Sequence, residues 1–288
     1  MPAKLTEYYR LTKPGIIYGN LLTTAGGFLF AAGRSPDVRL LAATLLGTGL
    51  IIGSACVYNN YLDRHIDARM TRTAKRAMVQ GTVSVKAALA YGALLGVAGT
   101  AILTLLTNPI TVALGVIGFI AYVLIYTYAK RHTVHSTLIG TISGATPIVA
   151  GYTAVTGRFD LTALILFSVM VIWQMPHFYA IAMFRKDDYA AANIPVLSVA
   201  KGLRTTRTYT IWYIAGLLPV VGALAVFGRG GYIYAVVMSG FVLYWLAMAL
   251  LTMQQGLAYA AWARRVFGNS LIFLLLFSIM LSVDAWLP

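Results

Sequence analysis

Three oxygen-bearing side chains recur at every fourth residue of the segment CVYNNYLDRHID, namely Asn59, Asp63 and Asp67. In an α-helix, spacings of four and eight residues rotate a side chain by only about 40° and 80°, so all three would line one face over about 12 Å. Only eight acidic residues stand against 22 Lys and Arg, so two acids stacked at the end of an apolar segment indicate a specific role. Oxygen ligands suit Mg²⁺, which proteins usually hold with a few carboxylates plus substrate phosphates. The spacing therefore predicts a Mg²⁺ site that binds a phosphorylated substrate.

Basic residues follow this triplet within a dozen positions: Arg64, Arg69, Arg72, Lys75 and Arg76. A diphosphate needs both kinds of partner, because Mg²⁺ bridges its oxygens while guanidinium groups neutralise the remaining charge and stabilise it as it leaves. Alternatively, each of these basic residues could serve only to set the membrane topology. The triplet could likewise be a solvated helix end with salt bridges to Arg64 or Arg72. Carboxylates at a membrane edge favour the functional interpretation.

The composition places the chain in a bilayer. Of its 288 residues 59% are hydrophobic and 10% are charged, whereas soluble domains average about 25% charged. Long apolar runs, rather than short alternating ones, predict helices and exclude an outer-membrane barrel. We expect the apolar run after Lys13 to be a retained first helix rather than a cleaved signal. Cys56 is the only cysteine, so it forms no intrachain disulfide, and we expect it to be a packing residue.

Runs of about 20 apolar residues predict nine membrane spans in one polytopic domain that covers residues 1–288. The expected spans are 15–33, 40–60, 84–106, 110–129, 137–156, 161–183, 209–228, 231–253 and 269–287.

The basic residues divide unequally between the two sides of these spans. Eighteen of the 22 fall in the N-terminal tail and after the second, fourth, sixth and eighth spans, which leaves Arg34, Arg39, Arg158 and Arg229 for the other side. The positive-inside rule then predicts a cytoplasmic N-terminus and an outside C-terminus, with the triplet on the cytoplasmic side. The net charge of +14 follows from topology and contact with anionic lipid, so it does not call for nucleic acid.

Two further polar clusters fall on the same predicted side. The segment YTYAKRHTVH ends the fourth span. Lys130 and Arg131 could reach a phosphate, while Tyr126, Tyr128, His132 and His135 could simply form an interfacial belt.

The third cluster, WQMPHFYAIAMFRKDD, ends the sixth span. Pro176 should kink this helix. His177 beside it suits either a hydrogen bond to a neighbouring helix or contact with substrate. Asp187 and Asp188 follow as a second acidic pair, for which a solvated salt-bridge face is the alternative.

Three segments together carry a resemblance to a known family: NNYLDRHIDARMTRTAKR, KRHTVHSTLIGTISGATPIVAGY and WQMPHFYAIAMFRKDDYAAANIPVL. They resemble the UbiA-type intramembrane prenyltransferases from KPG at 13–15 onward. The triplet is typical of the whole superfamily, whereas WQMPH and AANIPVL are typical of its heme-modifying branch.

The resemblance implies nine helices around a central cavity, with a cytoplasmic polar cap that binds Mg²⁺ and farnesyl diphosphate. It implies transfer of the farnesyl group to the 2-vinyl group of heme B by a multi-pass protein of the cell (plasma or inner) membrane. A heme A synthase or a terminal oxidase assembly is the implied recipient of the product.

Site roles follow from the same resemblance. Asn59, Asp63 and Asp67 match the first metal and diphosphate motif. Arg72, Arg76, Lys130 and Arg131 match the basic positions near it, and with Arg64 and Lys201 they are the expected diphosphate-binding residues. As a mechanistic hypothesis, the expected aromatic or heme contacts are Tyr58, Tyr61, Tyr126, Trp173, Tyr179, His132 and His177. Many superfamily members have spaced aspartates after the sixth helix, whereas this chain has only Asp187 and Asp188, so a second Mg²⁺ there is an open expectation.

Two other functions stay open from the residues alone. Prenyl transfer to an aromatic or quinone precursor would use the same donor site. A secondary transporter of an organic anion would explain the basic loops and Pro176 as a broken helix, but it would not explain the stacked Asn-Asp-Asp face.

Overall fold

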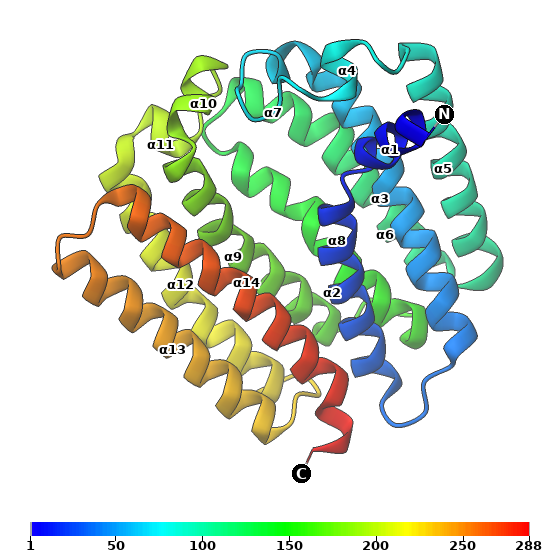
Figure 1. The fold of residues 1–288 in the computed structure, drawn as a ribbon. Helices are drawn as coiled ribbons and strands as arrows, with labels where there is room; N and C mark the ends of the chain where they lie inside the picture. Colours follow the sequence, from blue (N-terminus) through cyan, green and yellow to red (C-terminus); the bar gives the residue numbers. More distant parts are fainter. Residues whose placement is uncertain (1, 288) are drawn as a thin grey trace.

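The computed structural model describes residues 2–287, all of whose regular elements are helical (Figure 1). Long helices alternate in direction. In chain order they are α2 (Pro14–Ala32), α3 (Val38–Asp67), α5 (Val85–Leu106), α6 (Pro109–Ile120), α8 (Ser136–Thr156), α9 (Leu161–Phe184), α12 (Gly202–Val226), α13 (Tyr232–Gln254) and α14 (Tyr259–Val283).

Short elements complete the fold. They are α1 (Pro2–Leu11), α4 (Ala77–Gln80), the π-helix η1 (Ala121–Tyr126), α7 (Thr127–His132), α10 (Lys186–Ala191), α11 (Leu197–Ala200) and the 3₁₀ turn η2 (Asp284–Trp286). With α6, η1 and α7 counted as one span, the described residues contain nine helices long and apolar enough to cross a membrane. The predicted all-α class and the number of spans are confirmed.

Three of the predicted boundaries are wrong by seven residues or more. The seventh and ninth spans begin at Gly202 and Tyr259 rather than at 209 and 269. Hydropathy finds only the apolar part of a helix, and both helices continue beyond it through charged turns that carry Arg204 and Arg264. The second span likewise runs past 60 to Asp67, so the triplet is helical throughout.

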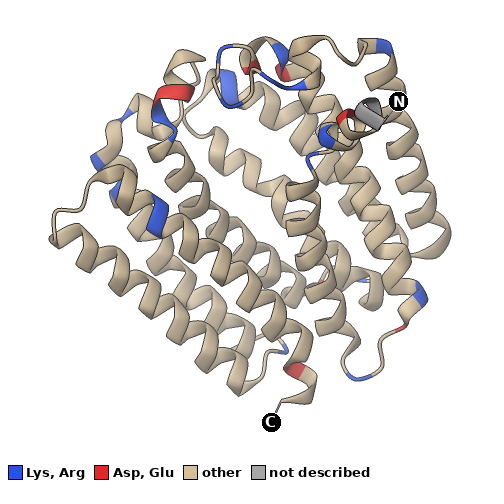
Figure 2. Cartoon of the chain, in the orientation of Figure 1, with Lys and Arg blue, Asp and Glu red and all other residues tan. Residues whose placement is uncertain are grey.

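Charged side chains gather at one end of the bundle, where α1, α4, α7, α10 and the loop 68–76 lie (Figure 2). We call this end the polar end. By the charge rule above it is the predicted cytoplasmic side.

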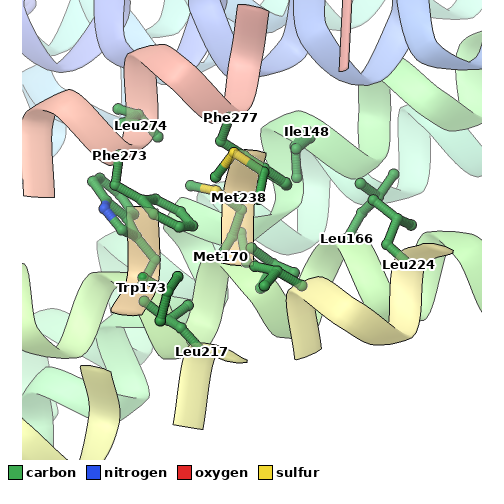
Figure 3. Close-up of a cluster of buried hydrophobic side chains, with 14 of the residues drawn as sticks. Ile148, Leu166, Met170, Trp173, Leu217, Leu224, Met238, Phe273, Leu274 and Phe277 are labelled. Atoms are coloured by element: carbon green, nitrogen blue, oxygen red, sulfur yellow. The ribbon is translucent and has the colours of Figure 1, made fainter. Parts of the chain in front are cut away.

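The C-terminal half of the bundle is a continuous apolar core. Side chains from α9, α12, α13 and α14 interdigitate around Met170, Met238 and Phe273 (Figure 3). Within this core the indole N–H of Trp173 donates to the Ser270 carbonyl at 2.8 Å, so α9 and α14 are fixed in register.

Glycines bring α2 and α8 into backbone contact. A Cβ atom at Gly27 would lie 2.2 Å from the Ile148 carbonyl oxygen, and one at Gly151 would lie 2.0 Å from the Thr24 carbonyl oxygen. Only a residue without a side chain permits such an approach, as is common between membrane helices.

We predict that Gly151→Ala destabilises the protein by about 1–3 kcal/mol, because the two backbones must separate. Thermal unfolding in detergent measures the effect. Gly240→Ala on α13 is the matched control, since a Cβ atom there meets nothing within 4 Å. Equal unfolding midpoints for the two variants would contradict this account of the α2–α8 contact.

Candidate active site

The triplet lies on one buried face of α3 at the polar end. Asn59, Asp63 and Asp67 are 2%, 3% and 3% exposed, whereas Tyr61 and Arg64 between them are more accessible. Three polar side chains withdrawn from water require partners, because an unpaired buried charge is costly.

Each carboxylate meets a cation from another part of the chain. Lys130 of α7 donates to Oδ2 of Asp63, and an Arg131 guanidinium nitrogen lies 3.6 Å from Oδ1 of the same residue. Arg76, at the end of the loop 68–76, lies 2.6 Å from Oδ2 of Asp67. The structure thus brings three predicted diphosphate-binding residues onto the two predicted metal-binding acids.

Asn59 contacts Lys13, a cation expected only as one of the topological charges of the N-terminal tail. The Nζ atom of Lys13 lies 2.5 Å from Oδ1 of Asn59, and Lys13 itself has a left-handed backbone with φ of 52° directly before Pro14. Burial lowers the pKa of Lys13 to about 8, because a neutral amide offsets little of the cost of removing an ammonium group from water. A lysine beside Pro-Gly at the start of the first apolar run was the signal that could have identified it.

A π-helical turn positions the other wall of the site. The wider turn η1 interrupts the span between α6 and α7, and such turns often occur at functional sites. The Tyr122 and Tyr126 rings stack with their centroids 5.7 Å apart. Thr127 directly after the π-turn accepts a hydrogen bond from Nδ2 of Asn59 at 3.1 Å. Lys130 lies 5.8 Å over the Tyr126 ring, so this predicted aromatic residue borders the acids.

Asp188 of the second acidic pair binds the loop 68–76 and not the triplet. Asp188 accepts hydrogen bonds from the Thr71 backbone N–H at 3.1 Å and from its hydroxyl at 2.7 Å. Asp187 is exposed, and neither acid contacts the triplet among the described residues. Burial raises the pKa of the Tyr189 hydroxyl, and the nearby Arg72 guanidinium partly offsets that shift. α10 therefore holds the loop that carries Arg72 and Arg76.

Two other expected phosphate binders lie apart from the acids. Arg64 stacks 4.3 Å from the centre of the Tyr61 ring and donates to the Tyr61 carbonyl at 2.8 Å. Lys201 is exposed at the start of α12.

The expected heme and cation contacts are dispersed. His132 is exposed and stacks on Tyr128. Tyr58 packs edge-on against Phe119. Tyr179 packs against Tyr213 of α12.

Trp173 and His177 lie together on α9, facing α14, with ring centroids 5.2 Å apart. Both side chains hydrogen-bond to Ser270, Trp173 to its carbonyl and His177 to its hydroxyl.

The donor set fits Mg²⁺ held jointly with phosphate. Oδ1 of Asp63 is buried and accepts no hydrogen bond among the described residues, although the Arg131 guanidinium lies 3.6 Å from it. Among the described residues, no three His, Cys, Asp or Glu side chains lie close enough together to hold a metal by themselves. Mg²⁺ commonly takes one or two carboxylates and completes its octahedron with substrate phosphate and water. The site is therefore suited to a metal that arrives with a diphosphate.

Sequence comparison finds relatives along almost the whole chain. A model described as the UbiA prenyltransferase family matches residues 20–277. The Protoheme IX farnesyltransferase 2 of Chromobacterium violaceum is 48% identical over 99% of this chain and 95% of its own length. The protoheme IX farnesyltransferase of Pectobacterium carotovorum subsp. carotovorum is 45% identical over 99% of this chain and 96% of its own length.

Structural comparison finds the same architecture in proteins of low sequence identity. A digeranylgeranylglyceryl phosphate synthase superposes with a TM-score of 0.80 at 15% identity, covering 98% of this chain and 99% of its own. A UbiA homologue from Archaeoglobus fulgidus, solved with GPP and Mg²⁺, superposes with a TM-score of 0.72 at 15% identity, covering 96% of this chain and 100% of its own.

We predict that Asp188→Ala releases the loop 68–76 and speeds tryptic cleavage after the exposed Arg72. The variant loses both hydrogen bonds to Thr71, each to a charged acceptor and so worth about 1.5–3 kcal/mol. Mass spectrometry of the digest in detergent gives the cleavage rate. Asp187→Ala removes an acid that makes no such contact and should be cleaved like the parent; equal rates for the two variants would refute the role of α10.

Proposed function

Because this chain belongs to the UbiA prenyltransferase family, we propose that it transfers a farnesyl group from farnesyl diphosphate to the 2-vinyl group of heme B. The product carries the hydroxyethylfarnesyl side chain of heme O. The observation that carries the proposal is identity of 45% and 48% to protoheme IX farnesyltransferases across nearly the full length of both chains. The buried acids beneath a set of cations support the diphosphate half of the reaction.

Charge balance explains why these cations sit on the acids. Arg76, Lys130 and Arg131 pair with Asp67 and Asp63, and Lys13 contacts the neutral Asn59, so the triplet carries an excess of two positive charges. That excess opposes a bare divalent cation but attracts a Mg²⁺ diphosphate complex, which is negative overall. We infer that the cations move from the acids to phosphate oxygens when the substrate binds, which frees Asn59, Asp63 and Asp67 for the metal.

The same residues assist departure of the diphosphate. Mg²⁺, when bound, supplies Lewis-acid stabilisation of the leaving group. Lys130, Arg131 and Arg76 hold the charge that develops as the carbon–oxygen bond breaks. The Tyr126 face at the border of the acids suits stabilisation of the allylic cation by a cation–π contact.

The acceptor step completes the reaction. The terminal carbon of the vinyl group bonds to C1 of the farnesyl cation, which leaves a positive charge on the vinyl carbon next to the porphyrin. Water adds there as a hydroxyl and releases a proton.

The setting of the reaction follows from the charge distribution. We place the polar end on the cytoplasmic face of the plasma or inner membrane, because the polar end holds the excess of Lys and Arg. From the family resemblance, we further propose that a heme A synthase or a terminal oxidase assembly receives the product.

The decisive experiment incubates membranes that contain the protein with heme B, farnesyl diphosphate and Mg²⁺, and identifies the product by mass. We predict that Asp63→Asn lowers the rate of farnesyl transfer by at least about 100-fold, because a neutral amide replaces a charged oxygen ligand of the proposed Mg²⁺. Glu7→Gln on α1 is the matched control, since Glu7 is no candidate site residue, and it should retain parental activity. Farnesylation of an aromatic or quinone precursor but not of heme would overturn the acceptor, and near-normal turnover by Asp63→Asn at saturating Mg²⁺ would overturn the metal assignment.

Lys13→Met should raise the KM for farnesyl diphosphate by about 10-fold or more without changing the KM for heme B. The expected size corresponds to one charge-assisted hydrogen bond. Steady-state kinetics in membranes separate the two values. Arg10→Met, which removes an exposed cation of the same N-terminal segment, should leave both values unchanged, and an equal effect of the two variants would remove Lys13 from the site.

A further inference from the structure

A second asparagine stands next to the triplet on α3 but binds a different part of the chain. Asn60 is 2% exposed. Its side-chain amide nitrogen Nδ2 donates to the Leu11 carbonyl at 2.8 Å and to the Cys56 carbonyl at 3.1 Å. Cys56 lies one turn earlier on α3, whereas Leu11 is the last residue of α1 and stands 49 residues before Asn60 in the chain. The Asn60 side chain therefore ties α1 to α3.

The Leu11 carbonyl depends on this bond. The last carbonyls of a helix have no donor within it, and α1 ends at Leu11. Leu11 is also 2% exposed and packs in an apolar cluster with Val57 and Met78, so it has little access to water. Among the described residues, no backbone N–H of the loops and caps donates to this carbonyl. The Asn60 amide is therefore the group that satisfies it.

The tied carbonyl lies two residues before Lys13, in a tight turn. The backbone N–H of Lys13 donates to the Arg10 carbonyl at 3.1 Å. Lys13 then adopts its left-handed conformation, and α2 starts directly afterwards. A residue with a side chain keeps a positive φ only where its surroundings hold it there. The bond from Asn60 is one such restraint, because it fixes the chain immediately before the turn.

Two adjacent asparagines thus hold one junction at two points. Asn60 fixes the backbone before the turn, and Oδ1 of Asn59 lies 2.5 Å from the Lys13 ammonium after it. α1 also packs edge-on through Tyr8 against Tyr91 of α5, with ring centroids 5.2 Å apart. Apolar packing is non-directional, whereas a hydrogen bond requires a narrow range of distance and angle. Asn60 therefore sets where the junction lies along α3.

We propose that Asn60 is a positioning residue for the donor substrate: by fixing the Leu11 carbonyl, it places the Lys13 ammonium where a phosphate oxygen of farnesyl diphosphate binds. This inference rests on the proposed function and adds a residue that does not itself touch the substrate. Because the backbone is anchored two residues before Lys13, only the lysine side chain has to move from Asn59 to the phosphate. A cation held near its final position loses less conformational entropy when the substrate binds.

Asn60→Ser tests the contact without leaving an unpaired polar group. A serine hydroxyl can donate to the Cys56 carbonyl, as Thr44 does to the Leu40 carbonyl at 2.7 Å earlier in α3, but it is too short to reach Leu11. We expect the KM for farnesyl diphosphate to rise by about 10-fold, with kcat, the KM for heme B and the Mg²⁺ dependence unchanged. A parental KM for farnesyl diphosphate overturns the proposal, and so does a shifted Mg²⁺ dependence, which would make Asn60 a metal ligand.

A double-mutant cycle shows whether Asn60 acts through Lys13. Lys13→Met combined with Asn60→Ser should raise the KM for farnesyl diphosphate no further than Lys13→Met alone. Two effects that multiply would overturn the positioning role. Ser54→Ala is the matched control, since it removes another buried hydrogen bond of α3, from the Ser54 hydroxyl to the Gly92 carbonyl at 2.7 Å. It should keep the parental KM, and a rise equal to that of Asn60→Ser would attribute the effect to a general loosening of α3 and overturn the proposal.

Binding of radiolabelled farnesyl diphosphate with Mg²⁺ to the purified protein, in detergent and without heme, gives a readout that needs no turnover. Asn60→Ser should weaken this binding by about 10-fold, and Ser54→Ala should match the parent. Parental binding by Asn60→Ser contradicts the inference. A parent whose diphosphate binding depends on Asn60 but that never farnesylates heme would refute the proposed function and leave the role of Asn60 standing.

Discussion

The burial of two carboxylates on α3 is the constraint on which the polar end depends. A charge removed from water must be paired, so Asp63 and Asp67 require Lys130 and Arg76 to reach them from α7 and from the loop 68–76. Together with the contact between Lys13 and Asn59, these pairs join three distant stretches of chain to one helical face. The interactions that close the polar end are also those that assemble the donor site.

The two halves of the bundle differ in polarity. The N-terminal half supplies acids, cations and the π-turn, all suited to a diphosphate. The C-terminal half is apolar, and its polar feature near the active end is the hydrogen bond between His177 and Ser270. An apolar half excludes water from a reactive cation.

Much of the donor site could be predicted from local rules. The spacing of Asn59, Asp63 and Asp67 identified one helical face, and hydropathy gave the number of spans. Hydropathy missed the starts at Gly202 and Tyr259, because helices continue through charged turns once they leave the hydrocarbon. It also missed η1, since a π-turn has the same composition as the α-helix around it.

The sequence by itself determined the helical membrane architecture and the alignment of the three oxygen ligands, because both depend on periodicity within one segment. Only the tertiary structure decided which cation meets which ligand, since those pairs join residues far apart in the chain: Lys13 with Asn59, and Lys130 with Asp63. It also separated Asp188, which binds Thr71, from the triplet that its composition resembles. The imidazole of His177 hydrogen-bonds to the hydroxyl of Ser270, 93 residues away, and no local pattern records a contact between helices.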